Sequence, residues 1–354
     1  MWQGEEVYRL SDNKPFTYPP FFAMPFVITP EVPMLPPRDA GPIVAWYVVT
    51  ALALVATFFL IHSNLKLSNL APQPNWLFYL LTLLLIGRYI GSVFGNQSHD
   101  LLVLLPIMLG CHQLLRERNP SAGFWLGVAA AFKATPLLFL VLLFLQRRWT
   151  AMACMITTII AVTLLPDLIF PRDDGKLWAW AWLTTFVINL NPGGPADTGP
   201  WHASNILNQS LSGSIHRIFS AYDWALWLSL SAQILVLALV SLSVFIREEK
   251  APILLLAQFS AVLCGMVLLS PMSSKAHFCV LLLPAAITTW DAMVNRNRLS
   301  IGAIIVVFCL GTLTSKDLVG RELGNQLLGY GTATWLALAL LIAVTFFCYR
   351  QQRN

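Results

Sequence analysis

Long apolar runs separated by short polar clusters make up most of the chain. A helix needs about 20 apolar residues to cross the hydrocarbon core of a bilayer, which is about 30 Å thick. Nine runs reach or approach that length. They cover residues 42–62, 75–93, 100–115, 148–170, 223–246, 251–270, 277–292, 299–314 and 332–349. The pattern therefore predicts an all-α, polytopic bundle of transmembrane helices.

A tenth apolar segment, residues 122–145, does not fit a single straight span. Arginine pairs flank it on both sides, within 116–118 and 147–148, and cytoplasmic loops are expected to hold such residues. Pro136 breaks the helix and leaves two arms of about 11 residues, each about 17 Å long. We therefore predict a re-entrant hairpin with Lys133 at its apex near mid-membrane, facing an internal cavity.

The remaining clusters of Lys and Arg set the orientation of the other segments. They predict an external segment 1–41, a transmembrane catalytic module 42–349 with a long external loop 171–222, and a cytoplasmic tail 350–354. A segment 1–41 on the outside requires a preceding span, so we expect the chain to be N-terminally truncated, with an upstream helix missing.

Composition excludes several classes of protein. The chain is 57% hydrophobic and 11% charged, with a mean hydropathy of +0.67, which is too little charge for a soluble domain. The net charge of +5 is spread over loops and forms no basic stripe, so we expect no nucleic-acid partner. The six cysteines lie in apolar runs without a zinc-binding spacing, so we expect neither disulfides nor a metal.

Two ionisable residues lie where hydrocarbon is expected. Lys133 at membrane depth costs about 2.5–3.5 kcal/mol on insertion scales, and such residues are candidates for functional sites. A phosphate would pair with it; the alternative is a lysine that snorkels to the interface. His277 opens a helix directly after the polar segment 270–275. It either binds a phosphate or a sugar hydroxyl near neutral pH, or it only caps the helix.

The long external loop combines tryptophans with side-chain amides. The tryptophans of 178–182 predict a short helix lying in the membrane interface. Trp201 and His202, with Asn208 and Gln209 nearby in the sequence, are less easily explained as anchors. Aromatic faces and amide groups suit a sugar ring, whose CH faces stack and whose hydroxyls need hydrogen-bonding partners.

Several motifs, in chain order, match one known family. They are FTYPP at 16–20, GNQ at 95–97, GVAAAFKATP at 127–136 followed by RRW at 147–149, NQSL at 208–211 with Arg217, and SPMS at 270–273 with His277. Together they resemble glycosyltransferase family 87. The resemblance implies a GT-C fold in the plasma membrane. It also implies transfer of a mannose-like hexose from a polyprenyl-phosphate donor to a lipid or glycan acceptor on the external face, with no cofactor.

The resemblance also implies roles for individual residues. Donor phosphate binding is expected at Lys133, His277 and Arg217. Sugar or acceptor binding is expected at Tyr18, Asn96, Gln97, Trp201, His202, Asn208, Gln209 and Ser273.

The general base stays unassigned. In GT-C enzymes it lies in the first external loop, and the GEEVY segment at 4–8 resembles an element that follows this acid, so the base is expected upstream of the chain. Glu5, Glu6 and Asp12 are substitutes. The alternative function is a membrane transporter or lipid flippase, although a transporter favours broken helices in both halves; a non-catalytic scaffold is a third reading.

Overall fold

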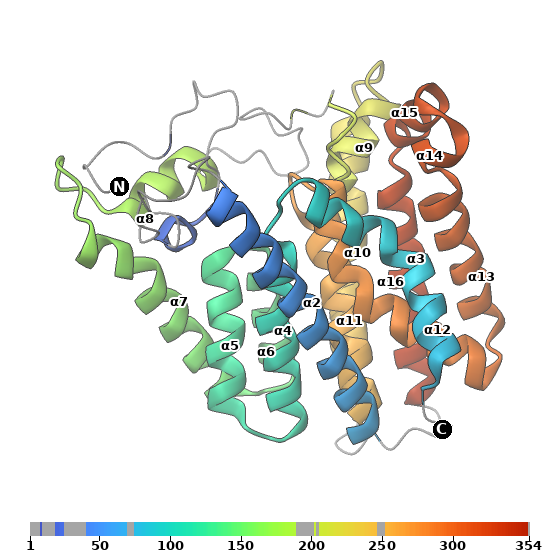
Figure 1. Ribbon diagram of the computed structural model, residues 1–354, viewed down its shortest axis with the longest axis horizontal. Helices are drawn as coiled ribbons and strands as arrows, with labels where there is room; N and C mark the ends of the chain where they lie inside the picture. Colours follow the sequence, from blue (N-terminus) through green and yellow to red (C-terminus); the bar gives the residue numbers. More distant parts are fainter. Residues whose placement is uncertain are drawn as a thin grey trace.

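The computed structural model describes residues 8, 18–24, 40–68, 74–188, 202, 205–245 and 252–352, without the side chains of 40–42. In these ranges the chain is helical and contains no strand, as the apolar pattern predicts (Figure 1). Most of the predicted external segment 1–41 and part of loop 171–222 lie outside the described residues, so the domain boundaries stay a prediction.

Each of the nine predicted runs forms a helix. Seven helical segments of the described part of the chain are long and apolar enough to cross a membrane. They are α2 (Ala40–Leu67), α3 (Trp76–Gly95), α7 (Trp149–Ile169), α10 (Ala225–Phe245), α11 (Pro252–Leu269), the 3₁₀-helix η4 (Lys275–Leu281) continued by α12 (Leu282–Asn295), and α16 (Thr332–Gln351). Shorter helices occupy the other two runs. These are α4 (Asp100–Leu115), and α13 (Arg298–Val307) continued by the π-helix η5 (Phe308–Leu313).

The segment between α4 and α7 folds back on itself. Helix α5 (Asn119–Phe132) ends at Lys133, whose backbone is extended (φ −151°, ψ 133°). The 3₁₀-helix η2 (Thr135–Leu138) and α6 (Phe139–Leu145) then run back toward the end of the bundle at which α5 begins (Figure 1). The predicted hairpin with Lys133 at its apex is therefore confirmed, while the side of the membrane on which it opens stays a prediction.

Close packing of α5 against α7 shows the direction of the first arm. A Cβ atom on Gly123 would lie 2.1 Å from the carbonyl oxygen of Ala151, and one on Gly127 would lie 2.8 Å from that of Met155. Small residues of this kind let two helix backbones approach closely. Because both contacts advance together along the two helices, α5 and α7 are parallel and begin at the same end of the bundle.

The first arm is longer than predicted. Helix α5 has 14 residues, which corresponds to about 21 Å at 1.5 Å per residue. Its neighbour α4 runs antiparallel to it, since a Cβ on Gly110 would meet Leu126, whereas Asp100 at the start of α4 contacts Lys133 just after the end of α5. The apex of the hairpin therefore reaches the N-terminal end of α4, while its depth in the membrane stays a prediction.

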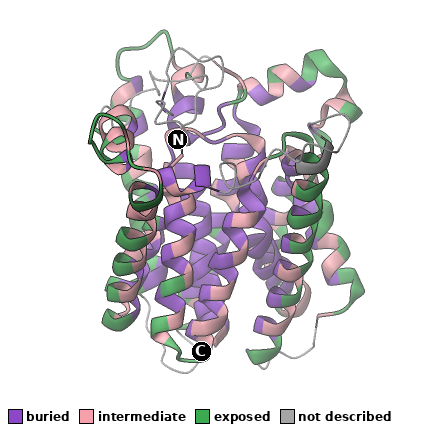
Figure 2. Cartoon of the chain, turned by 60° about the vertical axis from the view of Figure 1, so that its left-hand side comes forward, coloured by how far each residue is buried: buried purple, intermediate pink, exposed green. Residues whose placement is uncertain are grey.

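The buried core runs through the centre of the bundle. Helices α11 and α12 are buried along most of their length, whereas α2, α7 and α10 expose large apolar side chains. Figure 2 shows the buried residues gathered in the centre of the bundle and the exposed ones toward its outside. Exposed apolar surface of this extent suits lipid contact. The architecture is that of a polytopic membrane protein.

The described part of the long loop contains further helices. They are α8 (Trp178–Trp182), the π-helix η3 (Leu183–Val187) and α9 (Leu211–Ile218). Outside this loop, two short helices, α14 (Lys316–Val319) and α15 (Arg321–Gly329), precede α16. Trp178 is buried with Tyr8 and Phe186, so the interfacial role predicted for this tryptophan is wrong. Trp180 is exposed, as an interfacial anchor would be.

Candidate functional site

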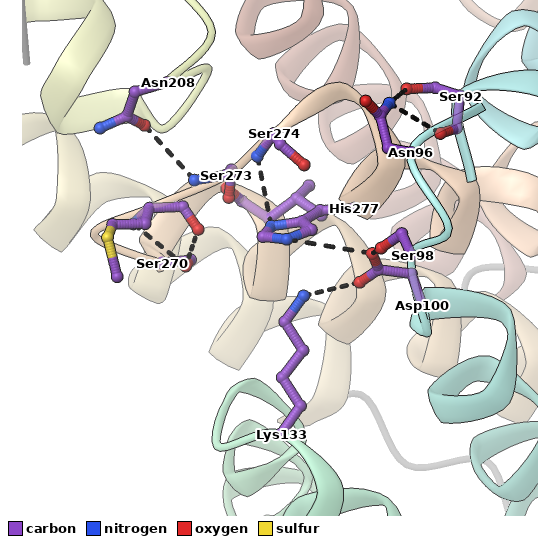
Figure 3. Close-up of polar contacts among 12 residues, drawn as sticks. Ser92, Asn96, Ser98, Asp100, Lys133, Asn208, Ser270, Ser273, Ser274 and His277 are labelled. Atoms are coloured by element: carbon purple, nitrogen blue, oxygen red, sulfur yellow. Dashed lines mark hydrogen bonds and ion pairs between the residues drawn. The ribbon is translucent and has the colours of Figure 1, made fainter. Parts of the chain in front are cut away.

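The apex of the hairpin carries an ion pair. Lys133 Nζ lies 2.6 Å from Asp100 Oδ1 (Figure 3), and Asp100 is 1% exposed. The lysine follows the last residue of α5, and the aspartate is the first residue of α4. Because α4 and α5 are antiparallel, the start of one helix meets the end of the other. Lys133 therefore already has a carboxylate partner in the protein, which the sequence analysis did not assign.

Asp100 has two further polar neighbours. The Ser98 hydroxyl donates a hydrogen bond to Asp100 Oδ2, and His277 Nε2 lies 3.9 Å from the same oxygen. Figure 3 shows the lysine, the histidine and the serine converging on this one carboxylate from three separate parts of the chain. A buried carboxylate is stable only with such compensation.

The other ring nitrogen of His277 is already in use. Ser274 and His277 form a capping box at the start of η4, in which the Ser274 backbone N–H donates to His277 Nδ1 at 3.3 Å. The capping role, one of the two alternatives for His277, is thus observed, while its binding of a phosphate or a sugar hydroxyl stays a prediction. In the neutral ring Nδ1 accepts, so Nε2 carries the proton, and His277 presents an N–H donor toward Asp100.

These side chains line a small pocket, partly open to solvent. Its wall comes from α4, the hairpin apex, the end of α11 and η4. The lining residues are Asp100, Val103, Lys133, Thr135, Met266, Val267, Ser270, Ser273, His277 and Val280. Besides the Asp100 carboxylate, the pocket presents one ammonium and one imidazole N–H, and such donors suit an anionic group such as a phosphate.

An aromatic cluster lies beside the ion pair. The His99 ring packs against Tyr18 and Phe22, with ring centroids 4.3 and 4.1 Å apart, and Phe22 also contacts Phe132 on α5. Burial lowers the pKa of His99 to about 3, so this imidazole is uncharged at neutral pH. Tyr18, a predicted sugar-binding residue, thus contacts His99, the residue directly before Asp100 in the sequence.

Four other predicted residues brace the rim of the pocket. Arg217 donates to the backbone oxygens of Gly329, Asn205 and Asn208. Asn208 Oδ1 accepts from the Ser273 N–H, and the Gln209 N–H donates to the Ser273 oxygen at 2.6 Å. The Gln209 side chain bonds the backbone of Leu328 and Ala333.

These bonds join the start of α9 to the segment 270–273 and to the start of α16. Ser273 lines the pocket but donates its hydroxyl to the Val267 oxygen. Arg217, Asn208 and Gln209 are not among the lining residues. The same bonds place the pocket at the end of the bundle opposite the C-terminus, because α16 begins here and runs away from it.

The remaining predicted residues lie apart or outside the described ranges. The Asn96 side chain is exposed and bonds back to Ser92, and the neighbouring Gln97 is exposed in a left-handed conformation (φ 50°). His202 is exposed. Trp201, Glu5, Glu6 and Asp12 lie outside the described residues.

Sequence reasoning missed Asp100. The signal was present, because an acidic residue follows a short polar loop and opens a predicted helix. Within the described ranges no group of three or more His, Cys, Asp or Glu side chains is arranged to hold a metal ion. That the protein needs no cofactor stays a prediction.

Comparison with known proteins agrees with the resemblance read from the motifs. The sequence model of glycosyltransferase family 87 matches residues 16–271, and the chain belongs to this family. A curated relative is the polyprenol-phosphate-mannose-dependent alpha-(1-2)-phosphatidylinositol mannoside mannosyltransferase of Mycobacterium tuberculosis, 26% identical over 288 residues. The match covers 78% of this chain and 62% of the relative. No solved structure matches the chain, so the GT-C type of the fold stays a prediction.

Proposed function

We propose that the protein is a membrane glycosyltransferase whose hairpin-apex pocket receives the phosphate of a polyprenyl-phosphate-linked hexose. The hexose, mannose-like as in the relative's donor, passes to a lipid or glycan acceptor at the end of the bundle opposite the C-terminus. Membership of glycosyltransferase family 87 and the donor and acceptor named for the relative support this proposal. We further propose the plasma membrane as its location, with the C-terminus cytoplasmic.

The observation that carries the proposal is the convergence of Lys133 and His277 on one pocket. A polyprenyl-phosphate sugar is a phosphodiester with one negative charge and needs a cation and hydrogen-bond donors in a region of low dielectric. The Lys133 ammonium supplies the charge, and His277 Nε2–H supplies a directed donor. Charge-assisted hydrogen bonds of this kind are about twice as strong as neutral ones.

The neighbouring groups suit the rest of such a donor. Thr135 lines the same pocket, and its hydroxyl offers a further partner to the phosphate or the sugar, whereas the Ser270 hydroxyl donates to the Met272 oxygen. The rings of Tyr18 and Phe22 lie beside the ion pair, where aromatic faces can stack on a sugar. The general base that accepts the proton of the acceptor hydroxyl stays unassigned.

The test is a transfer assay with the purified chain in lipid nanodiscs. Radiolabelled polyprenyl-phosphate mannose is supplied with a phosphatidylinositol mannoside acceptor, and labelled product is separated by chromatography. Lys133→Met combined with Asp100→Asn removes the cation and its counter-ion together, and transfer is expected to fall below detection. The matched control is Lys66→Met, since Lys66 is an exposed lysine at the opposite end of the bundle.

Transfer that persists in the double variant at the wild-type rate would contradict the proposed donor site. Donor binding without transfer, with movement of the labelled lipid between leaflets, would instead support a transporter or flippase.

A further inference from the structure

The charges around the pocket balance before any donor arrives. Asp100 carries one negative charge and Lys133 one positive charge, 2.6 Å apart and both buried. His277 is 3.9 Å from Asp100 and, as a neutral ring, adds nothing to the sum. Among the described residues, the other titratable groups that face Asp100 are Tyr18, His99 and Cys279. None of these three is charged near neutral pH.

An anionic phosphate upsets this balance. Once the phosphate contacts Lys133, two negative groups, the phosphate and Asp100, share one positive charge in a buried site. Two negative groups that contact the same ammonium are close together, and their repulsion strongly disfavours the ionised state of one of the two. Either Asp100 or His277 must then take up a proton, because no second cation lines the pocket within the described residues.

The hydrogen bonds around His277 decide between the two. A protonated imidazole carries hydrogen on both ring nitrogens, but Nδ1 of His277 already faces the Ser274 backbone N–H. Protonation would place two donors against each other and break the capping box. Asp100 has no such obstacle, because a protonated carboxyl still accepts from Ser98 and can donate to the phosphate.

We propose that Asp100 binds a proton when the donor phosphate binds Lys133, so that donor and proton enter the site together. This inference rests on the proposed function and names Asp100 as its positioning residue. In the empty site Asp100 holds Lys133 at the pocket wall. With donor bound, the Lys133 ammonium leaves Asp100 and forms its ion pair with the phosphate. The neutral Asp100 carboxyl and His277 Nε2–H then become hydrogen-bond donors to the anion.

The test is isothermal titration of the purified chain in nanodiscs with polyprenyl-phosphate mannose, without acceptor. The probe is a phosphodiester and keeps one negative charge throughout the pH range used. The titration is repeated in buffers that differ in their enthalpy of ionisation, because the change in measured binding enthalpy then gives the number of protons taken up. We expect uptake of about one proton, and an affinity that weakens by about tenfold per pH unit on the alkaline side.

Two variants separate Asp100 from His277. Asp100→Asn is expected to bind the donor without proton uptake, independently of pH, and as tightly as the wild type or more tightly. His277→Gln keeps a neutral donor at the Nε2 position and is expected to keep the uptake while binding more weakly. His112→Gln is the control, since His112 bonds Asn64 away from the pocket.

Donor binding by the wild type without proton uptake would overturn the inference, and so would uptake that survives in Asp100→Asn or disappears in His277→Gln. If Asp100→Asn does not fold, the wild-type proton count and the His277→Gln result still decide. Failure of the wild type to bind the donor at all would instead contradict the proposed function.

Discussion

Lys133 and Asp100 are 33 residues apart in the sequence and 2.6 Å apart in the structure. They meet because the hairpin arm α5 lies antiparallel to α4, so that the broken end of one helix reaches the first residue of the other. A lysine exposed to hydrocarbon would be costly. Its partner makes the hairpin apex stable and gives the pocket a cation that is already in position.

Stability is expected to depend on the pair rather than on either member. Lys133→Met leaves the buried Asp100 carboxylate without its cation, and breaking a buried pair in this way costs about 3–5 kcal/mol. The double variant Lys133→Met/Asp100→Asn removes both charges and is expected to recover most of that loss. Thermal unfolding of the wild type, Lys133→Met, Asp100→Asn and the double variant in detergent measures the coupling between the two charges. Additive losses in the double variant would show that the two charges do not interact.

The hairpin predicts the accessibility of its two ends. Arg116 precedes the first arm and Thr150 follows the second, and both residues are exposed. Cysteine at either position, in a cysteine-free background, is expected to react with an impermeant maleimide from the same side of the membrane. Asp173→Cys, beyond the other end of α7, is the control for the opposite side. Opposite sides for the first two positions would contradict the hairpin.

The rim contacts predict a structural role for Arg217. Burial lowers the pKa of this guanidinium to about 10, so it stays charged at neutral pH while it bonds three backbone oxygens. Arg217→Leu is expected to lower the unfolding temperature, because charged hydrogen bonds contribute about 1.5–3 kcal/mol each. Donor affinity of the folded fraction is expected to change by less than about threefold. A large loss of affinity with unchanged stability would return Arg217 to the donor site, where the sequence placed it.

Acid is expected to destabilise the aromatic cluster through His99. Histidine in an unfolded chain titrates near about pH 6.5, whereas burial lowers the pKa of His99 to about 3. Between these values the unfolded state binds a proton that the folded state does not. Stability therefore falls as the pH is lowered through this window, by up to about 1.4 kcal/mol per pH unit.

Replacing His99 tests that assignment. His99→Phe keeps a ring against Tyr18 and Phe22 and is expected to flatten this part of the pH dependence of the unfolding temperature. The exposed His202, changed to Asn, is the control. An unchanged profile in His99→Phe would show that other groups carry the acid sensitivity.

Local signals predicted the hairpin, and tertiary packing determined the site. The arginine pairs and Pro136 lie within or beside the segment they shape, so charge and backbone sterics were sufficient. The partner of Lys133 depends on the register between α4 and α5, which sequence spacing does not reveal. The sugar or acceptor binding expected of Asn208 and Gln209 stays a prediction; their bonds to Ser273, Leu328 and Ala333 join segments far apart in the sequence, so these contacts could not be predicted from it.

The most direct measurement is a cryo-electron microscopy structure of the chain in nanodiscs with polyprenyl-phosphate mannose bound. We predict that the donor phosphate lies within about 3 Å of Lys133 Nζ, with His277 Nε2 directed at a phosphate oxygen. Asp100 is expected to have lost its contact with Lys133. A phosphate bound elsewhere, with the Lys133–Asp100 pair intact, would contradict the proposed donor site.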